Sequence, residues 1–534
     1  VSSGRGMNVS VVDCQMEAAN PAFQSITFGG QAHLLRGSRV FEVLRRGGQI
    51  FAQSKGSAET YRLSGPVDHL DAFLSHNWST RRRDKYLVLA WYFNQRAAYI
   101  ATFLLMAVCV VLTEYGILPV QEFVWRDGSI WTSGISCTLV GPPIFLAVLF
   151  AGSELRQCTG CGGPIVFLDK TCIHQTDVAL KQDGIRRLAA FLKHSRSMVI
   201  VYTDEYLVKL WTVYELASML VLHPMGKICV IPAVLPHIVL FGTFLIFCCV
   251  NLQRSFFLVY VHDRLGGRVY LLMIFVAMPL AAIPLAFLGR ELARARANIL
   301  KKVAQFRLQG ASCYMEEDRP VVEGNIIAFV RCIGLVGEEE DDVEAALEVF
   351  NQLVREEVPR ALVASLGRQG IPYCIILAIS LSHILRLGDL LHTFLGGLHP
   401  WREFVSHVLF QTTLYLAIFP LFMAGSLQIT AQMPGGKIGP NSFTLILSMQ
   451  LVLFMGFMVA IWYGLEVLFI ELETSDMWIA PCAGAAGIVL ALTALVYRPA
   501  DRAAVQRASL SSSNLESASR SLRLVCTRVV GSFL

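Results

Sequence analysis

The sequence predicts an α/β domain with a parallel sheet, joined to an α-helical membrane domain of about eight spans. Two observations carry this prediction. The chain of 534 residues is 54% hydrophobic and only 16% charged, with a mean hydropathy of +0.53, whereas soluble domains average about 25% charged residues. Short apolar runs rich in β-branched residues also alternate with helical patterns, which is typical of a parallel sheet with crossover helices.

The stretch Ser197–Met219 contains the clearest strand and helix of the chain. It opens with an apolar, mostly β-branched run, as in a buried strand. Thr203 and Asp204 then supply N-cap oxygens for a helix, on which Glu215 lies one turn after Trp211. The loop between strand and helix is therefore expected at the carboxyl edge of the sheet, where open α/β folds bind ligands.

Three other apolar runs predict strands of the same sheet, namely Ala72–Leu74, Pro164–Lys170 and Lys227–Ala233. The first is followed directly by polar residues, and the second continues into a polar loop from Asp169 to Asp177. Because the carboxyl ends of parallel strands share one edge, these loops are expected to meet near Glu215. A further strand is predicted at Phe306–Met315, beside the last of the three.

Two of these stretches resemble a TIR (Toll/interleukin-1 receptor homology) domain. Asp71–Trp78, with the sequence DAFLSHNW, is similar to the first TIR strand, of the type Asp-x-Phe-(Ile/Leu)-Ser. Trp211–Leu216 is similar to the Trp-Cys-x-x-Glu-Leu of the helix after the third strand, with Thr212 in place of Cys. The resemblance covers Asp71–Ala233 apart from an inserted membrane hairpin, and it implies a flavodoxin-like parallel sheet.

In enzymatic TIR domains a Glu on this helix is catalytic, and it aligns with Glu215. The resemblance thus implies an NAD⁺ nucleosidase with NAD as substrate and no bound cofactor or metal. The nucleotide would bind to residues of two loops and of the helix that carries Glu215: Ser75, His76, Asn77, Trp78, Asp169, Asp177 and Trp211. A carboxylate there would stabilise the oxocarbenium cation that develops when the nicotinamide–ribose bond breaks. The alternative is a surface carboxylate that pairs with Lys209 or Arg196 or faces water.

The predicted organisation interrupts the TIR-like domain with membrane hairpins. Its parts are an N-terminal segment of unassigned fold (1–68), the TIR-like domain (69–96 and 157–233), two transmembrane hairpins (97–153 and 233–289), a cytosolic α/β linker expected to complete the sheet (290–369), four transmembrane helices (370–497) and a basic, Ser-rich disordered tail (498–534).

Eight apolar segments are the predicted spans: Ala97–Thr113, Ile135–Ser153, Ala233–Leu252, Val269–Leu288, Ile371–Leu385, Phe404–Leu427, Phe443–Leu465 and Met477–Val496. An even number of spans puts both termini on one side of the membrane. The Arg and Lys residues beside the spans favour the cytosol for both termini and for the TIR-like domain.

Signalling at a membrane, with the bilayer, NAD and TIR-like self-association as partners, is the function that these features predict. A non-enzymatic TIR-like scaffold and a transporter or channel with a TIR-like regulatory domain are the alternatives. The net charge of +5, without a basic stripe that carries aromatic residues, argues against nucleic acid. Cys158 and Cys161, with Cys172 and His174, have the wrong spacing for common zinc fingers and are more typical of juxtamembrane thiols.

Overall fold

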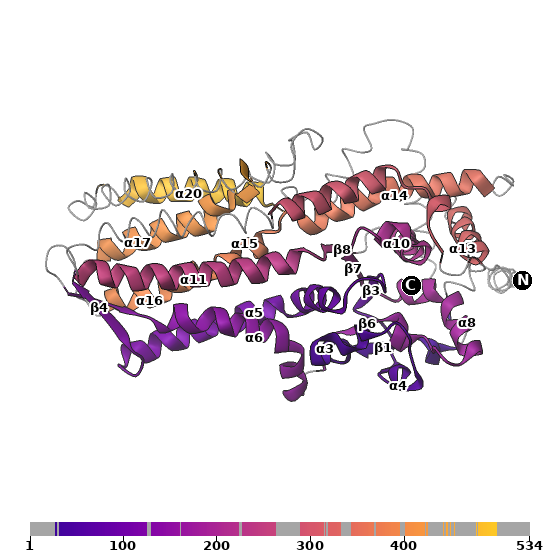
Figure 1. Ribbon diagram of the computed structural model, residues 1–534, viewed down its shortest axis with the longest axis horizontal. Helices are drawn as coiled ribbons and strands as arrows, with labels where there is room; N and C mark the ends of the chain where they lie inside the picture. The colour runs from indigo at the N-terminus through magenta and orange to yellow at the C-terminus, as the bar shows by residue number, and fades with distance from the viewer. Residues whose placement is uncertain are drawn as a thin grey trace, which may run out of the picture.

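The computed structural model describes residues 27–498 with gaps, the longest of them at 263–288, 333–342, 425–441 and 454–476, and only scattered positions from 442 to 453. The predicted span Val269–Leu288, most of Phe443–Leu465 and the tail at 499–534 lie outside the described residues. Figure 1 shows the α/β domain at one end of the molecule and long helices extending from it.

The centre of the α/β domain is a six-stranded sheet with the order β2-β1-β6-β3-β7-β8. Four neighbouring strands are parallel: β6 (Ile165–Phe167), β3 (Ala72–His76), β7 (Ser197–Tyr202) and β8 (Lys227–Pro232). In chain order these strands occupy the first four places of the doubly wound order 2-1-3-4-5. The predicted mixed α/β fold with a parallel-rich sheet is confirmed, and each of the four predicted strands lies in it.

Two strands from the N-terminal segment extend the sheet. β1 (Arg36–Arg39) pairs antiparallel with β6 on one side and with β2 (Ser64–Pro66) on the other. Neither strand shows an alternation of apolar and polar residues, and their sequences, RGSR and SGP, are poor in β-branched side chains. Their pairing is a long-range contact, so residues 1–68 contain no local pattern that indicates it.

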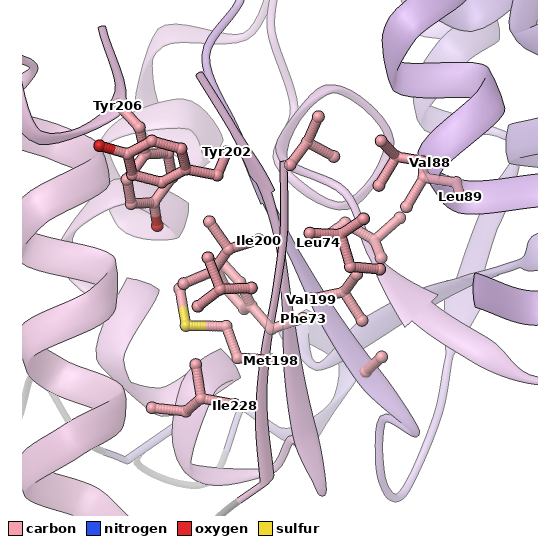
Figure 2. Packing of buried hydrophobic residues seen from close by; sticks show 14 of the residues in the cluster. Phe73, Leu74, Val88, Leu89, Met198, Val199, Ile200, Tyr202, Tyr206 and Ile228 are labelled. Atoms are coloured by element: carbon pink, nitrogen blue, oxygen red, sulfur yellow. The ribbon is translucent and has the colours of Figure 1, made fainter. Parts of the chain in front are cut away.

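Side chains alternate between the two faces of the sheet. Figure 2 shows Phe73, Met198 and Ile200 on the face that also carries Tyr202 and Tyr206, while Leu74 and Val199 face Val88 and Leu89. All of these side chains are at most 4% exposed. The first face packs against α10 (Leu210–Leu222), and the second against α5 (Arg82–Glu114) and α3 (Val40–Gly48).

The predicted strand at Phe306–Met315 is wrong. The described part of it contains a 3₁₀ turn, η4 (Leu308–Gly310), and β8 pairs only with β7 in the described sheet. Helix α14 (Val343–Leu366) packs along the free edge of β8 instead. There Val230 N donates to Ser365 Oγ at 2.8 Å, so a side chain takes the place of a fifth parallel strand.

Three described helices are long and apolar enough to cross a membrane: α5, α6 (Ser136–Cys158) and α11 (Leu235–His262). A fourth span is formed if α15 (Tyr373–Ile379) and α16 (Leu381–Leu395), which meet at 58°, cross together. The described residues therefore hold three or four such spans, not eight. The regions predicted as the sixth and eighth spans contain shorter apolar helices, α17 (Trp401–Thr413) with the π-helix η6 (Leu414–Ile418), and α20 (Ile479–Val496).

The remaining elements are short, apart from α13. They are η1 (Ala32–Leu34), η2 (Gln49–Ala52), α4 (Ala58–Tyr61), the hairpin β4 (Val120–Val124) and β5 (Ile130–Gly134) between α5 and α6, α7 (Asp169–Cys172), α8 (Val178–Arg186), α9 (Leu188–Lys193), η3 (Tyr206–Val208) and α13 (Arg319–Cys332).

Candidate functional site

A group of polar side chains gathers at the carboxyl edge of the parallel strands. Ser75 ends β3, Asp169 follows β6, and Glu215 lies on the helix after β7. Ser75 Oγ donates to Glu215 Oε2 at 2.5 Å and lies 2.6 Å from the hydroxyl of Tyr206. Because Ser75 donates its one proton to Glu215, Tyr206 donates in turn to Ser75. The three residues form one hydrogen-bonded chain.

The position of Glu215 depends on where its helix begins. α10 begins at Leu210, after the 3₁₀ turn η3, and its N-cap Lys209 provides no side-chain hydrogen bond. The prediction that Thr203 and Asp204 cap this helix is therefore wrong. The buried Thr212 hydroxyl donates to the carbonyl oxygens of Tyr206 and Lys209, the latter at 2.9 Å, and thereby fixes the turn to the helix.

The carboxyl group of Glu215 lies in an environment that favours its neutral form. Burial raises the pKa of Glu215 to about 8, the Ser75 hydrogen bond opposes this rise, and the nearby Asp169 carboxylate adds to it. Burial also raises the pKa of Asp169, against hydrogen bonds from Trp78 and the Lys170 amide. Both side chains remain half-buried, so solvent or a ligand can reach them.

Trp78 connects this carboxyl pair to two buried lysines. Its Nε1 donates to Asp169 Oδ2 at 2.8 Å. Lys85 Nζ lies 4.5 Å from the centroid of the Trp78 ring and donates to the Trp78 carbonyl at 3.3 Å. Lys85 is fully buried, and Lys170 Nζ donates to the carbonyls of Ile50 and Gln53 at 2.9 and 2.6 Å. These cations offset the charge of Asp169.

His76 faces the other side of the sheet from Ser75, as consecutive residues of a strand must. Its ring lies 4.7 Å from that of Trp78 and 5.4 Å from that of Phe51. Burial lowers the pKa of His76 well below its usual range, so the imidazole is neutral. Its Nε2 is buried and has no hydrogen-bond partner among the described atoms.

The other predicted site residues divide into those at the site and those outside it. Asn77 is buried and donates to Glu205 Oε2 at 3.4 Å, which ties the loops after β3 and β7 together. Asp177 is exposed and caps α8 by accepting from Leu180 N at 3.0 Å. Trp211 packs edge-on against Tyr214, with ring centroids 5.8 Å apart. The structure thus gives Asp177 a local structural role.

The predicted alternative partners of Glu215 are also wrong, because its hydrogen bond goes to Ser75 and Arg196 pairs with Asp71 at 3.4 Å. Sequence reasoning missed Tyr206, Lys85 and Lys170. Lys85 follows Arg81–Arg83 in a charged run that is typical of a solvated surface. The sequence contains one indication that Lys85 is buried: it lies four residues before the apolar Leu89, on the same face of a helix.

No group of three or more metal-ligating side chains comes together in the part of the chain that the structure describes, and Cys158 is exposed. Protein-family models, curated proteins and solved structures give no significant match to this chain. Fold and site together define a mixed α/β domain with a carboxyl-bearing site at its sheet edge. The domain is attached to helices that are long and apolar enough to cross a membrane.

Proposed function

We propose that this chain is an integral, multi-pass membrane signalling protein whose TIR-like domain lies in the cytosol, with both termini, and hydrolyses NAD at its N-glycosidic bond. One observation carries the proposal: the half-buried Glu215 carboxyl lies at the carboxyl edge of the parallel sheet, hydrogen-bonded to Ser75. That edge is where open α/β folds bind nucleotides. A carboxyl group there, in surroundings that raise its pKa to about 8, is a candidate for catalysis.

The reaction needs a negative charge close to the ribose. The bond between ribose C1′ and the nicotinamide nitrogen breaks, the nitrogen keeps the electron pair, and nicotinamide leaves as a neutral molecule. The cation that remains on the ribose is stabilised by the ionised Glu215. Water then adds to C1′ and releases one proton.

The cationic nicotinamide ring of the substrate prepares Glu215 for this role. A positive charge within about 4–6 Å favours the ionised form of a carboxyl group. NAD binding therefore lowers the pKa of Glu215 from its value of about 8 in the free protein. The hydrogen bonds from Tyr206 to Ser75 and from Ser75 to Glu215 hold Oε2 of Glu215 in place during this change. Trp78, half-buried beside Asp169, offers a ring for stacking with the nucleotide.

NAD consumption by purified protein tests the proposal directly. The Glu215→Gln variant keeps the shape and an acceptor for Ser75 but removes the charge. We expect nicotinamide release to fall about a hundredfold or more, as for the loss of one electrostatic group elsewhere. Glu356→Gln on α14 is the matched control and should retain wild-type turnover. Absence of wild-type turnover, or equal turnover in both proteins, would leave a non-enzymatic scaffold as the function.

A further inference from the structure

Two interrupted helices meet in the helical region outside the α/β domain. The bend of 58° between α15 and α16 falls at Ser380, and α17 continues into the π-helix η6. The rings of His383 on α16 and Tyr415 on η6 stack at 3.9 Å, nearly parallel at 10°. Broken helices and π-helical turns in membrane proteins often mark binding sites. Here the two interruptions are brought together by one ring contact.

The backbone around these interruptions has its hydrogen-bond partners. Thr243 Oγ1 donates to the carbonyl of Ala378, just before the bend, at 3.0 Å. The hydroxyl of Tyr373 donates to the carbonyl of Leu416 in the π-helix at 2.7 Å. Hydroxyl groups of neighbouring helices therefore serve the backbone of both broken segments, as the interior of a membrane requires.

Three side-chain atoms on the helices α16 and α17, which meet at this ring contact, have no such partner. They are Ser382 Oγ, His383 Nδ1 and Gln411 Oε1, all buried and without a hydrogen bond among the described atoms. Ser382 is 0% and Gln411 is 3% exposed. Gln411 precedes Tyr415 by one helical turn, which puts it on the face that meets His383. Each unpaired buried polar atom costs about 1–3 kcal/mol, so a ligand that supplies partners is favoured.

The charges and the atom types select the kind of ligand. Arg386 lies one turn beyond His383 on the same face of α16 and acts on its ring electrostatically, which disfavours a cation. The unpaired atoms of His383 and Gln411 are a ring nitrogen and an amide oxygen, so they call for N–H or O–H donors, which a simple anion does not supply. Asp389, the next acidic residue on α16, is already used: its carboxylate accepts from the amides of Cys137 and Thr138, both at 2.9 Å.

We propose that His383, Gln411 and Ser382 form a hydrogen-bonding site for a small uncharged molecule with N–H or O–H donors, inside the helix bundle. This inference rests on the membrane part of the proposed function and is independent of NAD cleavage at Glu215. Nδ1 of His383 and Oε1 of Gln411 accept from the ligand. The Ser382 hydroxyl adapts as donor or acceptor.

Titration of the full chain in lipid nanodiscs with acetamide tests the site. The readout is the ¹⁵N NMR signal of the His383 ring, assigned by its loss in His383→Phe, a change that keeps an aromatic ring on Tyr415. Acetamide should shift this signal in a saturable manner. Acetone, which has nearly the same size but lacks a donor, should not. Gln411→Met should weaken acetamide binding about tenfold, the equivalent of one hydrogen bond.

The control is Gln352→Met on the exposed surface of α14, which should bind acetamide like the wild type. The proposal is overturned if acetamide gives no saturable shift, if acetone shifts the signal equally, or if only water exchanges at the ring. Unchanged affinity in Gln411→Met would also overturn it. NAD turnover measured on the same nanodiscs reports separately on Glu215, and recovery of the chain in the nanodiscs reports on membrane insertion.

Discussion

Ser75 and Glu215, which are 140 positions apart in the sequence, share a hydrogen bond of 2.5 Å between Oγ and Oε2. The bond exists because β3 and β7 are neighbours in register, with Ser75 opposite Ile200, so the helix after β7 returns over the end of β3. The Ser75 hydroxyl lowers the pKa of Glu215 against the effect of burial. This pair is therefore the place where substitutions are most informative.

We expect the stability of the domain to depend on pH through Glu215. In the folded state its pKa is raised from 4.5 to about 8, so the folded protein holds a proton that the unfolded chain releases. Stability should fall as pH rises from about 4.5 to 8, with a slope of at most about 1.4 kcal/mol per pH unit. Partial exposure reduces this slope. Thermal melts of wild type and Glu215→Gln between pH 5 and 9 measure it.

In these melts Glu215→Gln should have a flatter profile and should exceed the wild type in melting temperature above pH 8. A residual slope of the same sign should remain, because burial also raises the pKa of Asp169. Parallel profiles for the two proteins would show that Glu215 ionises normally in the folded state.

Ser75→Ala should move the pH dependence of NAD turnover to higher pH. The variant removes the hydrogen bond that lowers the pKa of Glu215, so ionisation of Glu215 requires a more alkaline solution. Turnover at neutral pH should decrease severalfold and recover in part toward pH 9. Tyr206→Phe, which leaves the Ser75–Glu215 bond in place, should change the profile less. An equal loss at every pH would assign Ser75 to substrate binding instead.

Asp169→Asn should destabilise the domain by about 1 kcal/mol, because its one amide oxygen cannot accept from both Trp78 Nε1 and the Lys170 amide. The lost attraction to the buried Lys85 is offset by relief of a buried carboxylate. The double variant Asp169→Asn/Lys85→Met should recover part of this loss, since the unpaired cation is then absent. Chemical denaturation of the wild type, both single variants and the double variant gives the coupling energy. Additive losses would mean that the two residues do not interact.

Ser365→Ala should open the edge of the sheet locally. It removes the acceptor of the Val230 amide, at a cost of about 1 kcal/mol. Hydrogen exchange at Val230 should accelerate, while the amide of Val199, inside the sheet, should keep its protection. If Val230 exchanges as slowly in the variant, α14 protects the edge by packing alone.

The proposed topology predicts that the hairpin strands β4 and β5 lie across the membrane from the α/β domain. Asp127→Asn creates an N-glycosylation sequon there in one step, because Gly128 and Ser129 follow the substituted position. In a secretory expression host this variant should gain a glycan, seen as an endoglycosidase-sensitive shift on a gel. Asp127→Gln is the control without a sequon. A glycan on the natural sequon at Asn77 would reverse the orientation.

The sequence predicted the parts of the fold that depend on local pattern. The strands at Ala72, Pro164, Met198 and Lys227 were found because their apolar runs are continuous, as buried strands require. β1 and β2 were missed because an edge strand such as RGSR has no such pattern. Phe306–Met315 was assigned to the sheet because the predicted fold has a fifth parallel strand beside Lys227–Ala233. In the structure, Ser365 on α14 accepts the hydrogen bond from the Val230 amide at that edge.

In the candidate site, too, the residues that follow from a local pattern were predicted, and those that depend on contacts with other elements were missed. Glu215 and Ser75 were predicted from loops that a parallel sheet brings to one edge. Tyr206 was missed because it lies in a 3₁₀ turn that the sequence predicted as the first turn of a helix. Lys85 was missed because burial of a lysine depends on Trp78 and Asp169, which come from other elements.

Helix α5 runs without interruption over 33 residues, from Arg82, three residues before the buried Lys85, to Glu114 at the far end of the apolar helices. A helix of this length is about 50 Å long and behaves as a stiff rod. Tilting such a rod by about 5° about one end displaces the other by about 4 Å. Thickening or thinning of a bilayer changes the tilt of the helices that cross it. In the membrane topology that we propose, the same rod that carries Lys85 to the side of Trp78 converts bilayer thickness into movement beside Asp169.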